Sequence, residues 1–457
     1  MQPTPWNRPH GRNQHRTLEV SGGTGVGRGR QCDSAKYQRP SHRRHQLGGP
    51  ALGCKQPECA HNFHLGVSAM TPRSPSKPAI AGISLIEMMI AMVIGLVLML
   101  GVIQVFSASR TASMLAEGSA RAQENGRFAL EFLQRDIRMA GHFGCVNDQA
   151  HFVRGEGDPV VTTGAASGSG HPLDFSVSVQ GYEAPNTKPT NILTIGANWA
   201  VPTNLPASIS KLNPRGGSDI LVLRYLAPES VPITGLTSGS NSVVNFNATS
   251  GLRLTEGGQA APTLFGIADC AHATVFKGVY ASDKVTANGT NLSNYSARPT
   301  GQALIYRAES FVYYVGTSAT TGEPALMRAR SNGLDDYGTP EELVEGIENL
   351  QLLFGLDQTA NMSTTSPPLG NINTQAIASD VSTGADVAAA GQWRRVGQVQ
   401  VGILARSPLP SAAEKPTTAV RYPSALGVSF ALPAQTDGRY RMTYESTIAL
   451  RNRLFGN

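Results

Sequence analysis

The sequence predicts an α+β fold in which one long N-terminal α-helix precedes a β-rich region. Residues 83–106 are an almost uninterrupted apolar run with one ionisable group, which is typical of a membrane-spanning helix. Residues 107–141 continue with apolar side chains three and four positions apart, the spacing of an amphipathic helix. From residue 142 onward, short β-branched and aromatic runs alternate with Gly, Asn, Ser and Pro, which indicates strands joined by turns.

Charge is distributed unevenly along the 457 residues. The formal net charge is +6, only 15% of residues are charged and 40% are apolar. This composition excludes a coiled coil and a highly charged disordered chain, and it leaves enough apolar residues for a sizeable core. Residues 1–82 hold 12 Lys and Arg against three acids, so residues 83–457 have a net charge of −3. The basic character therefore belongs to the region before the apolar run.

The apolar run 83–106 is long enough to cross a bilayer, because about 20 helical residues span a hydrocarbon core of about 30 Å. Arg73 and Lys77 precede it, so the positive-inside rule places the N-terminus in the cytoplasm and the bulk of the chain across the membrane. Two simpler interpretations remain open. The run could be a secretory signal cut near 107–109, or a plain anchor that tolerates Glu87 close to the helix start.

The amphipathic half, residues 107–141, extends the same helix. Phe128, Leu133 and Ile137 lie on one side of the predicted helix, and Gly141 is a suitable C-terminal stop. We expect one helix over residues 84–140, with its first half in lipid and its second half packed on the exported domain. Two separate helices are the alternative.

Several strands are expected in the β-rich region 142–457. A hairpin connection is expected at 316–322, and two polar, low-complexity segments, 161–171 and 359–391, are expected to be mobile surface loops. The strand predictions cover residues 220–225, 243–246, 304–306, 311–315, 350–354, 399–403 and 447–450.

Five cysteines fall on the two sides of the apolar run. Cys145 and Cys270 follow it, and an oxidising compartment favours a disulfide between two exported cysteines. Two unpaired buried thiols are the alternative. Upstream, the series Cys54, Cys59, His61 and His64 offers four potential zinc ligands, but they are crowded and no helix pattern carries the histidine pair, so no metal site is expected.

Residues 1–69 are expected to be an over-long gene start. Met70 begins a basic segment of 13 residues that ends at Gly82. The upstream residues are rich in Arg, Gly, His and Pro and lack apolar periodicity, so they predict no folded domain.

No catalytic, cofactor or nucleic-acid motif is apparent. The sequence contains no G-x-S-x-G, H-E-x-x-H or P-loop pattern, which argues against an enzyme. Because the exported region is net acidic, no nucleic-acid partner is expected. Asp335 and Asp336, with Glu341 and Glu342 nearby, could offer oxygen ligands to calcium, but EF-hand spacing is absent and a solvated acidic loop is favoured.

Residues 82–87, GISLIE, resemble the processing site of type IV prepilins, in which a basic leader ends in Gly and Glu is the fifth residue of the new chain. The resemblance implies that a prepilin peptidase cuts between Gly82 and Ile83 and methylates the new amine of Ile83. Ile83 departs mildly from the commoner Phe or Met. Glu87 would meet the Ile83 amine of a neighbouring subunit and set the axial register of a filament.

The wider chain is similar to the PilW family of type IV pilus minor pilins. The resemblance implies a pilin-like fold, with the long helix packed on an antiparallel β-sheet head that large loop insertions enlarge. It divides the chain into a leader removed by cleavage (1–82), a transmembrane half-helix (83–106), an amphipathic half-helix (107–141) and a head (142–457). The segments that carry it are 82–106, 127–145, 269–276, 338–357, 393–407 and 447–453.

The PilW resemblance also implies partners and a location. The partners are prepilin peptidase, other minor pilins, the major pilin, the inner-membrane assembly platform and the lipid bilayer. The protein would be single-pass in the inner membrane with a periplasmic head, and would later lie near the tip of a surface pilus whose assembly it helps to initiate. A type II secretion pseudopilin and a ligand-binding pilin, either an adhesin or a DNA-uptake receptor, are the alternatives.

Overall fold

The computed structural model of the protein describes residues 82–144, 146–147, 159–359, 368–411, 422–432 and 437–454. The predicted gene start, the upstream cysteines and histidines, and Cys145 lie outside the described residues.

Helix α1 runs without a break from Leu85 to Met139, a length of 55 residues. It begins at Ser84, whose side chain caps the first turn, and ends before Gly141, which adopts a positive φ of 75°. At about 1.5 Å per residue such a helix is roughly 80 Å long. The expectation of one helix is therefore confirmed, and the alternative of two helices is wrong.

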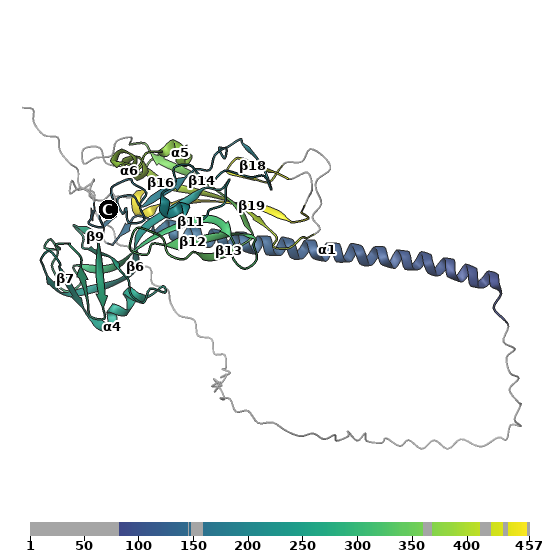
Figure 1. The fold of residues 1–457 in the computed structure, drawn as a ribbon, viewed down its shortest axis with the longest axis horizontal. Helices are drawn as coiled ribbons and strands as arrows, with labels where there is room; N and C mark the ends of the chain where they lie inside the picture. The colour runs from purple at the N-terminus through teal and green to yellow at the C-terminus, as the bar shows by residue number, and fades with distance from the viewer. Residues whose placement is uncertain are drawn as a thin grey trace, which may run out of the picture. The chain divides into compact units, whose positions relative to one another are not determined.

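The two halves of α1 have different surroundings. Its large apolar residues up to Phe106 are exposed, and α1 is the one helix in the described chain that is long and apolar enough to cross a membrane. Its second half lies against the strands of the head (Figure 1). The buried positions recur every three or four residues, as one face of a helix requires: Gly118, Ala122, Gly126, Ala129, Leu133, Asp136 and Ile137.

The first sheet of the head has ten strands, and all its pairings are antiparallel except that of β3 with β9. Its order is β13-β12-β11-β8-β9-β10-β7-β6-β4, with β3 beside β9. The strands are β3 (Val160–Val161), β4 (Val179–Tyr182), β6 (Ile220–Thr237), β7 (Val243–Phe246), β8 (Leu264–Ala268), β9 (Ala273–Ala281), β10 (Lys284–Ala287), β11 (Leu304–Thr317), β12 (Pro324–Arg330) and β13 (Glu341–Glu345).

Part of this sheet closes on itself. Strand β6 pairs with both β7 and β11, and β11 pairs in turn with β8, so six strands form a ring in the order β6-β7-β10-β9-β8-β11. Phe265, Phe276 and Ile305 contribute to the apolar cluster of this ring. Part of the expected insertion in the head is therefore a folded lobe. Because its six strands close into a ring, they leave no exposed strand edge within the ring.

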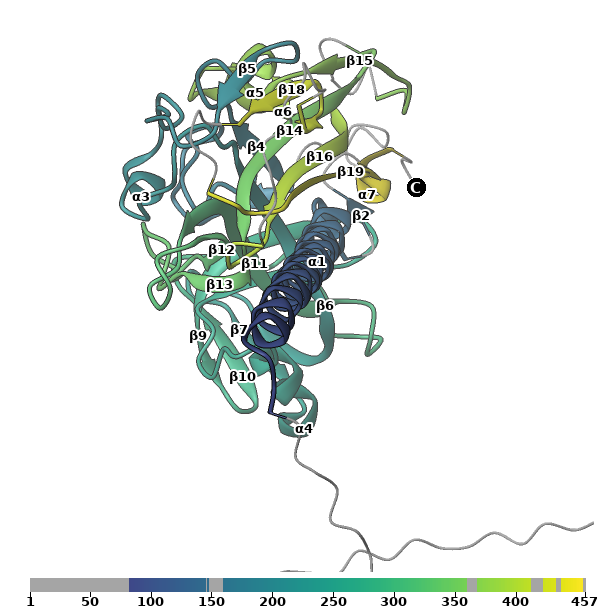
Figure 2. The same cartoon turned by 90° about the vertical axis from the view of Figure 1, so that its right-hand side faces the viewer.

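The second sheet has the order β15-β14-β16-β19 and is antiparallel throughout. Figure 2, which looks along α1, shows the helix between β13 and β6 with β16 and β19 above it. Side chains of α1 and of both sheets share the largest apolar cluster, which includes Leu133, Leu223 and Phe354. The strands are β14 (Ile347–Asp357), β15 (Ile372–Ala376), β16 (Val396–Arg406) and β19 (Arg441–Ala449).

Smaller elements complete the described chain. They are strands β1 (His142–Phe143), β2 (Val146–Asn147), β5 (Ile192–Thr194), β17 (Ser424–Ala425) and β18 (Val428–Ala431), helices α3 (Ala207–Ser210), α4 (Ala248–Gly251), α5 (Ala378–Val381), α6 (Val387–Arg394) and α7 (Arg451–Leu454), and the 3-10 helix η1 (Leu252–Thr255). A long helix followed by an antiparallel head confirms the predicted fold class.

One sequence prediction about the head is incomplete and another is wrong. Segments 304–306 and 311–315 are strand as predicted, but they are parts of one longer strand, β11. The segments expected to be mobile loops contain ordered elements and some buried residues where they are described: Thr163 is buried and donates to the Leu173 carbonyl, and 372–394 contains β15, α5 and α6. A Cβ at Gly168 would collide with the Asp386 carbonyl, so the small residues that suggested mobility instead permit close packing.

Replacement of Trp393 by alanine is expected to destabilise the head by about 3–5 kcal/mol, because large-to-small changes in a core leave a cavity. Trp393 in α6 is 1% exposed and packs edge-to-face on Phe354 with ring centroids 5.1 Å apart. Urea unfolding of the full chain in detergent measures the loss. Leu369→Ala, at a side chain that is 63% exposed, is the matched control and should change stability by less than about 0.5 kcal/mol. Equal effects would contradict the packing of α6.

Candidate processing and assembly site

The residues just before α1 are open to another protein. Gly82, Ile83 and Ser84 are exposed and non-helical, and Ile83 is 73% exposed. Among the described residues, and apart from Gly82 and its chain neighbours, no heavy atom lies within 4 Å of the place where a side chain on Gly82 would begin. An accessible peptide bond in non-helical backbone is what a protease requires, so this arrangement is compatible with cleavage between Gly82 and Ile83.

Glu87 lies in the first turn of α1 with an exposed side chain. Its backbone N–H donates to Ser84 Oγ at 3.3 Å. Sequence reasoning missed this role of Ser84, although the Ser-x-x-Glu spacing is the usual signal of a helix N-terminus. The carboxylate also lies where the positive end of the helix dipole favours an acid. Glu87 is therefore placed at a helix start where it can meet a cation from outside the chain.

A buried polar contact attaches the second half of α1 to the head. Asp136, 5% exposed, accepts a hydrogen bond from Tyr313 on β11 and pairs with Arg328 on β12 at 3.1 Å. Burial, followed by the charge of Asp136, raises the pKa of Tyr313 well above its ordinary value, so the phenol remains a donor. The sequence analysis did not identify Asp136. An acid between the apolar positions Leu133 and Ile137 of the packed helix face could have indicated a buried polar contact.

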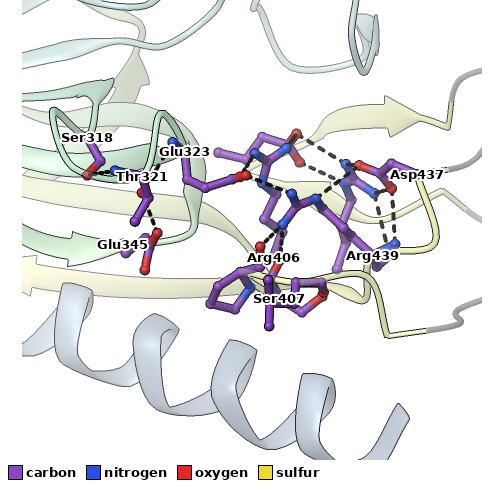
Figure 3. Close-up of polar contacts among 12 residues, drawn as sticks. Ser318, Thr321, Glu323, Glu345, Arg406, Ser407, Asp437 and Arg439 are labelled. Atoms are coloured by element: carbon purple, nitrogen blue, oxygen red, sulfur yellow. Dashed lines mark hydrogen bonds and ion pairs between the residues drawn. The ribbon is translucent and has the colours of Figure 1, made fainter. Parts of the chain in front are cut away.

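A second polar network joins β14, β16, the first residue of β19 and the residues just before it (Figure 3). Glu348 accepts from Arg406 at 2.9 Å and from Arg441 at 2.7 Å, while Glu323 accepts from Arg406 and, at 2.7 Å, from Arg439. The network therefore connects the hairpin between β11 and β12 to the second sheet.

Asp437 extends this network toward solvent. Burial alone would raise its pKa, but the hydrogen bonds and charge of Arg441 outweigh burial and lower the pKa of Asp437 to about 2. Arg441 itself is held between Asp437, at 2.6 Å, and Glu348. Guanidinium groups and carboxylates thus alternate through the network that connects the β11–β12 hairpin to the second sheet.

Replacement of Glu348 by glutamine is expected to destabilise the protein by about 3 kcal/mol or more, because it leaves two guanidinium groups without their shared carboxylate in a mostly buried site. Glu348 and Arg441 have side chains only 5% and 4% exposed. Thermal unfolding of the full chain checks this. Glu117→Gln is the control, since its pair with Arg121 is 68% and 60% exposed and should contribute less than about 1 kcal/mol. Similar losses in both variants would contradict the role given to Glu348.

The remaining predicted site residues have these positions. Cys270 is disulfide-bonded, and its pairing with Cys145 stays a prediction. The acidic segment has basic partners within the fold: Asp335 lies 3.3 Å from the ring of His171, and Asp336 pairs with Lys211 at 2.7 Å. Within the described ranges, no group of three or more His, Cys, Asp or Glu side chains is arranged to hold a metal ion.

Two carboxyls meet near β4. Asp219 is fully buried and accepts from the backbone N–H groups of Ala184 and Leu352, and Glu183 accepts from Thr187 Oγ1 at 2.9 Å. Burial raises the pKa of Glu183 to about 7, and burial together with the charge of Glu183 raises the pKa of Asp219 well above its usual range. The folded protein therefore favours protonated carboxyls here.

A pH dependence of stability follows from Glu183. Its folded-state pKa is raised, so its stabilising contribution is complete below pH 4.5 and is lost as the pH rises toward about 7. The stability of the native protein relative to Glu183→Gln should fall over that window by on the order of 2 kcal/mol. Urea unfolding of both proteins between pH 4.5 and 8 measures the difference, in which contributions of distant acids cancel. A difference independent of pH would contradict the raised pKa.

Two family models match this chain, one at the start of α1 and one in the head. Residues 77–103, which include Gly82, Ile83 and Glu87, match the prokaryotic N-terminal methylation motif. Residues 312–452, from β11 through β19, match the family model of the Type IV Pilus-assembly protein W. The resemblance to PilW-type pilins is therefore confirmed over these regions.

Comparisons with whole proteins add little to the family matches. A solved type IV-like pilin from Thermus thermophilus is 14% identical and has a TM-score of 0.18, with 43% of this chain and 86% of that chain covered. Its similarity is too low to support a common fold. The search of curated proteins finds no match.

Proposed function

We propose that the protein is a minor pilin that takes part in initiating and assembling a type IV pilus, within a tip complex of other minor pilins. The observation that carries the proposal is the combination, in one chain, of a methylation-motif match at the start of α1 and a PilW match in the head. Pilins of this kind are structural proteins, so no catalysis is assigned. The PilW match favours a pilus over the rival interpretation as a type II secretion pseudopilin.

The proposed partners follow from the two halves of α1. Prepilin peptidase would cut at Gly82 and methylate Ile83, and the exposed apolar half would remain in the inner membrane with the head in the periplasm. On assembly, this half would leave the lipid and pack among the helices of other minor pilins and the major pilin, under the action of the assembly platform. Exposed apolar residues that cover 22 positions of one helix need either lipid or protein around them.

Sequencing the N-terminus of the native protein tests the proposal directly. The expected result is a chain that begins at Ile83 with a methylated amine. A start after residues 107–109 would indicate a secretory signal, and an intact upstream segment would indicate a plain anchor. Either of these starts would refute the proposal.

A further inference from the structure

The carboxyl pair near β4 joins segments that are far apart in the sequence. Asp219, which directly precedes β6, is fully buried, and its two oxygens accept from the N–H groups of Ala184 and Leu352 at 2.9 and 2.8 Å. Glu183 directly follows β4, and its Oε2 accepts from the N–H of Ala378, the first residue of α5, at 3.2 Å. The pair therefore connects β4, β6, β14 and α5.

The hydroxyl of Thr187 shows which form of Glu183 fits this arrangement. Thr187 is buried, and its Oγ1 lies 2.6 Å from the Ala184 carbonyl oxygen and 2.9 Å from Glu183 Oε1. A hydroxyl has one hydrogen to donate, so an ionised Glu183 and the Ala184 carbonyl compete for it. A protonated Glu183 can instead donate to Thr187, which then donates to Ala184. Both contacts are therefore hydrogen bonds only when Glu183 is protonated.

The charges around Glu183 set the pH at which it ionises. Burial is the largest influence and raises the pKa of Glu183 to about 7, and the charge of Asp380 in α5 acts in the same direction. Lys188 opposes them, but it pairs with Asp380 at 3.5 Å and both side chains are more than half exposed. An ionised Glu183 also faces Asp219, because each carboxylate disfavours a second negative charge beside it. Glu183 is therefore protonated at mildly acidic pH and ionises as the pH rises toward neutral.

The attachment of α5 depends on this side chain. The residue before α5, Ile377, makes no capping hydrogen bond with its side chain, and Ala378 lies over β4, where a Cβ on Gly181 would come within 3.1 Å of the Ala378 Cβ. Glu183 and the segment 378–385 also line a polar cavity of about 100 Å³, which has room for water. An ionised Glu183 that turns into this cavity becomes hydrated and moves away from Asp219. It then loses its bond to the Ala378 N–H.

We propose that Glu183 is a pH-sensitive clasp, which holds α5 against β4 when it is protonated and releases the segment 377–385 when it is ionised. In Figures 1 and 2, α5 lies at the side of the head away from α1. Release would therefore change that outer surface and leave the contact of Asp136 with β11 and β12 in place. The clasp is independent of the proposed assembly role, because it uses no residue of the processing junction.

Hydrogen–deuterium exchange of the full chain in detergent, measured by mass spectrometry, tests the clasp. Glu183→Gln is the reference, because its neutral amide can donate to Thr187 and accept from Ala378 as the protonated acid does. The ratio of native to variant exchange removes the intrinsic effect of pH. Between about pH 5 and pH 8, native peptides that cover 377–385 should lose about fivefold or more of their protection relative to the variant, the factor expected for one hydrogen bond.

A distant strand and a second variant provide the controls. Peptides from β9 should stay protected at short labelling times at both pH values. Asp380→Asn removes an exposed acid of α5 and should keep the pH response of the native protein. A ratio that does not change with pH, or uptake that rises equally in 377–385 and in β9, would overturn the clasp. Loss of the response in Asp380→Asn would assign it to Asp380 and would also overturn the proposal.

Infrared difference spectra give a measurement that does not depend on exchange. At pH 5 the native protein should show the carbonyl band of a buried protonated carboxyl that Glu183→Gln lacks, and this band should disappear as the pH rises to 8. Both variants should keep the native circular dichroism spectrum at pH 5. A native protein without the band at pH 5 would contradict the protonated form of Glu183 on which the clasp depends.

Discussion

Replacement of Gly82 by valine is expected to leave the leader attached. Gly82 is exposed in non-helical backbone, and no described residue beyond its chain neighbours lies close enough to oppose a side chain there. A loss of cleavage must therefore come from a clash within the peptidase. Its active-site cleft has to accommodate the residue on the leader side of the cut, and valine is larger than glycine. Mass spectrometry of the protein recovered from membranes should find only the uncut form, whereas the native protein is expected to yield a chain that begins at Ile83.

The control for this experiment is Gly101→Ala. Gly101 also has no heavy atom within 4 Å of its missing side chain, but it lies inside α1 and away from the junction. That variant should be cut as efficiently as the native protein. A Gly82→Val chain that begins at Ile83 would contradict the assignment of the cleavage site.

Replacement of Glu87 by alanine is expected to leave cleavage intact and to reduce incorporation into pili at least tenfold. A carboxylate inside an apolar environment is costly unless it has a positive partner, on the order of 2.5–3.5 kcal/mol at a bilayer centre. Cleavage would create such a partner, because it frees an α-amine at Ile83, four residues before Glu87. Quantitative immunoblots of sheared pili against whole cells measure the incorporated fraction.

Two further variants sharpen the Glu87 experiment. Glu87→Gln keeps a hydrogen-bonding side chain without the charge, so it should behave like the alanine variant if the ion pair is decisive. Glu117→Ala removes an exposed acid farther along the same helix and should incorporate normally. Native levels of Glu87→Ala in pili would refute an assembly role for this carboxylate.

Two polar networks join separate parts of the head. Asp136 attaches the second half of α1 to β11 and β12. Glu323, in the hairpin between β11 and β12, pairs with Arg406 of β16 and with Arg439, and so ties that hairpin to the second sheet.

The sequence by itself determined the helix and the candidate processing site. Both are local: the apolar run and the three-to-four spacing predict α1 from consecutive residues, and residues 82–87 carry the motif in one stretch. The strand predictions were correct in position and incomplete in length, since β11 continues through residues 307–310, which contain two charged side chains. Arg307 and Glu309 are buried there as a pair, and Glu309 also lies 3.1 Å from Arg330 of β12, a partner that a local pattern cannot anticipate.

Only the tertiary structure decided how distant segments meet. Closure of the six-stranded ring depends on β6 bonding to two partners, and the contact of Asp136 with Tyr313 joins residues 177 positions apart. Small polar residues in 161–171 and 359–391 predicted mobile loops, because a local pattern does not show contacts with distant segments such as those of Thr162 with Val275 and of the Ala378 N–H with Glu183. Periodicity reports which face of an element is apolar, whereas the partner of that face is set by packing across the whole chain.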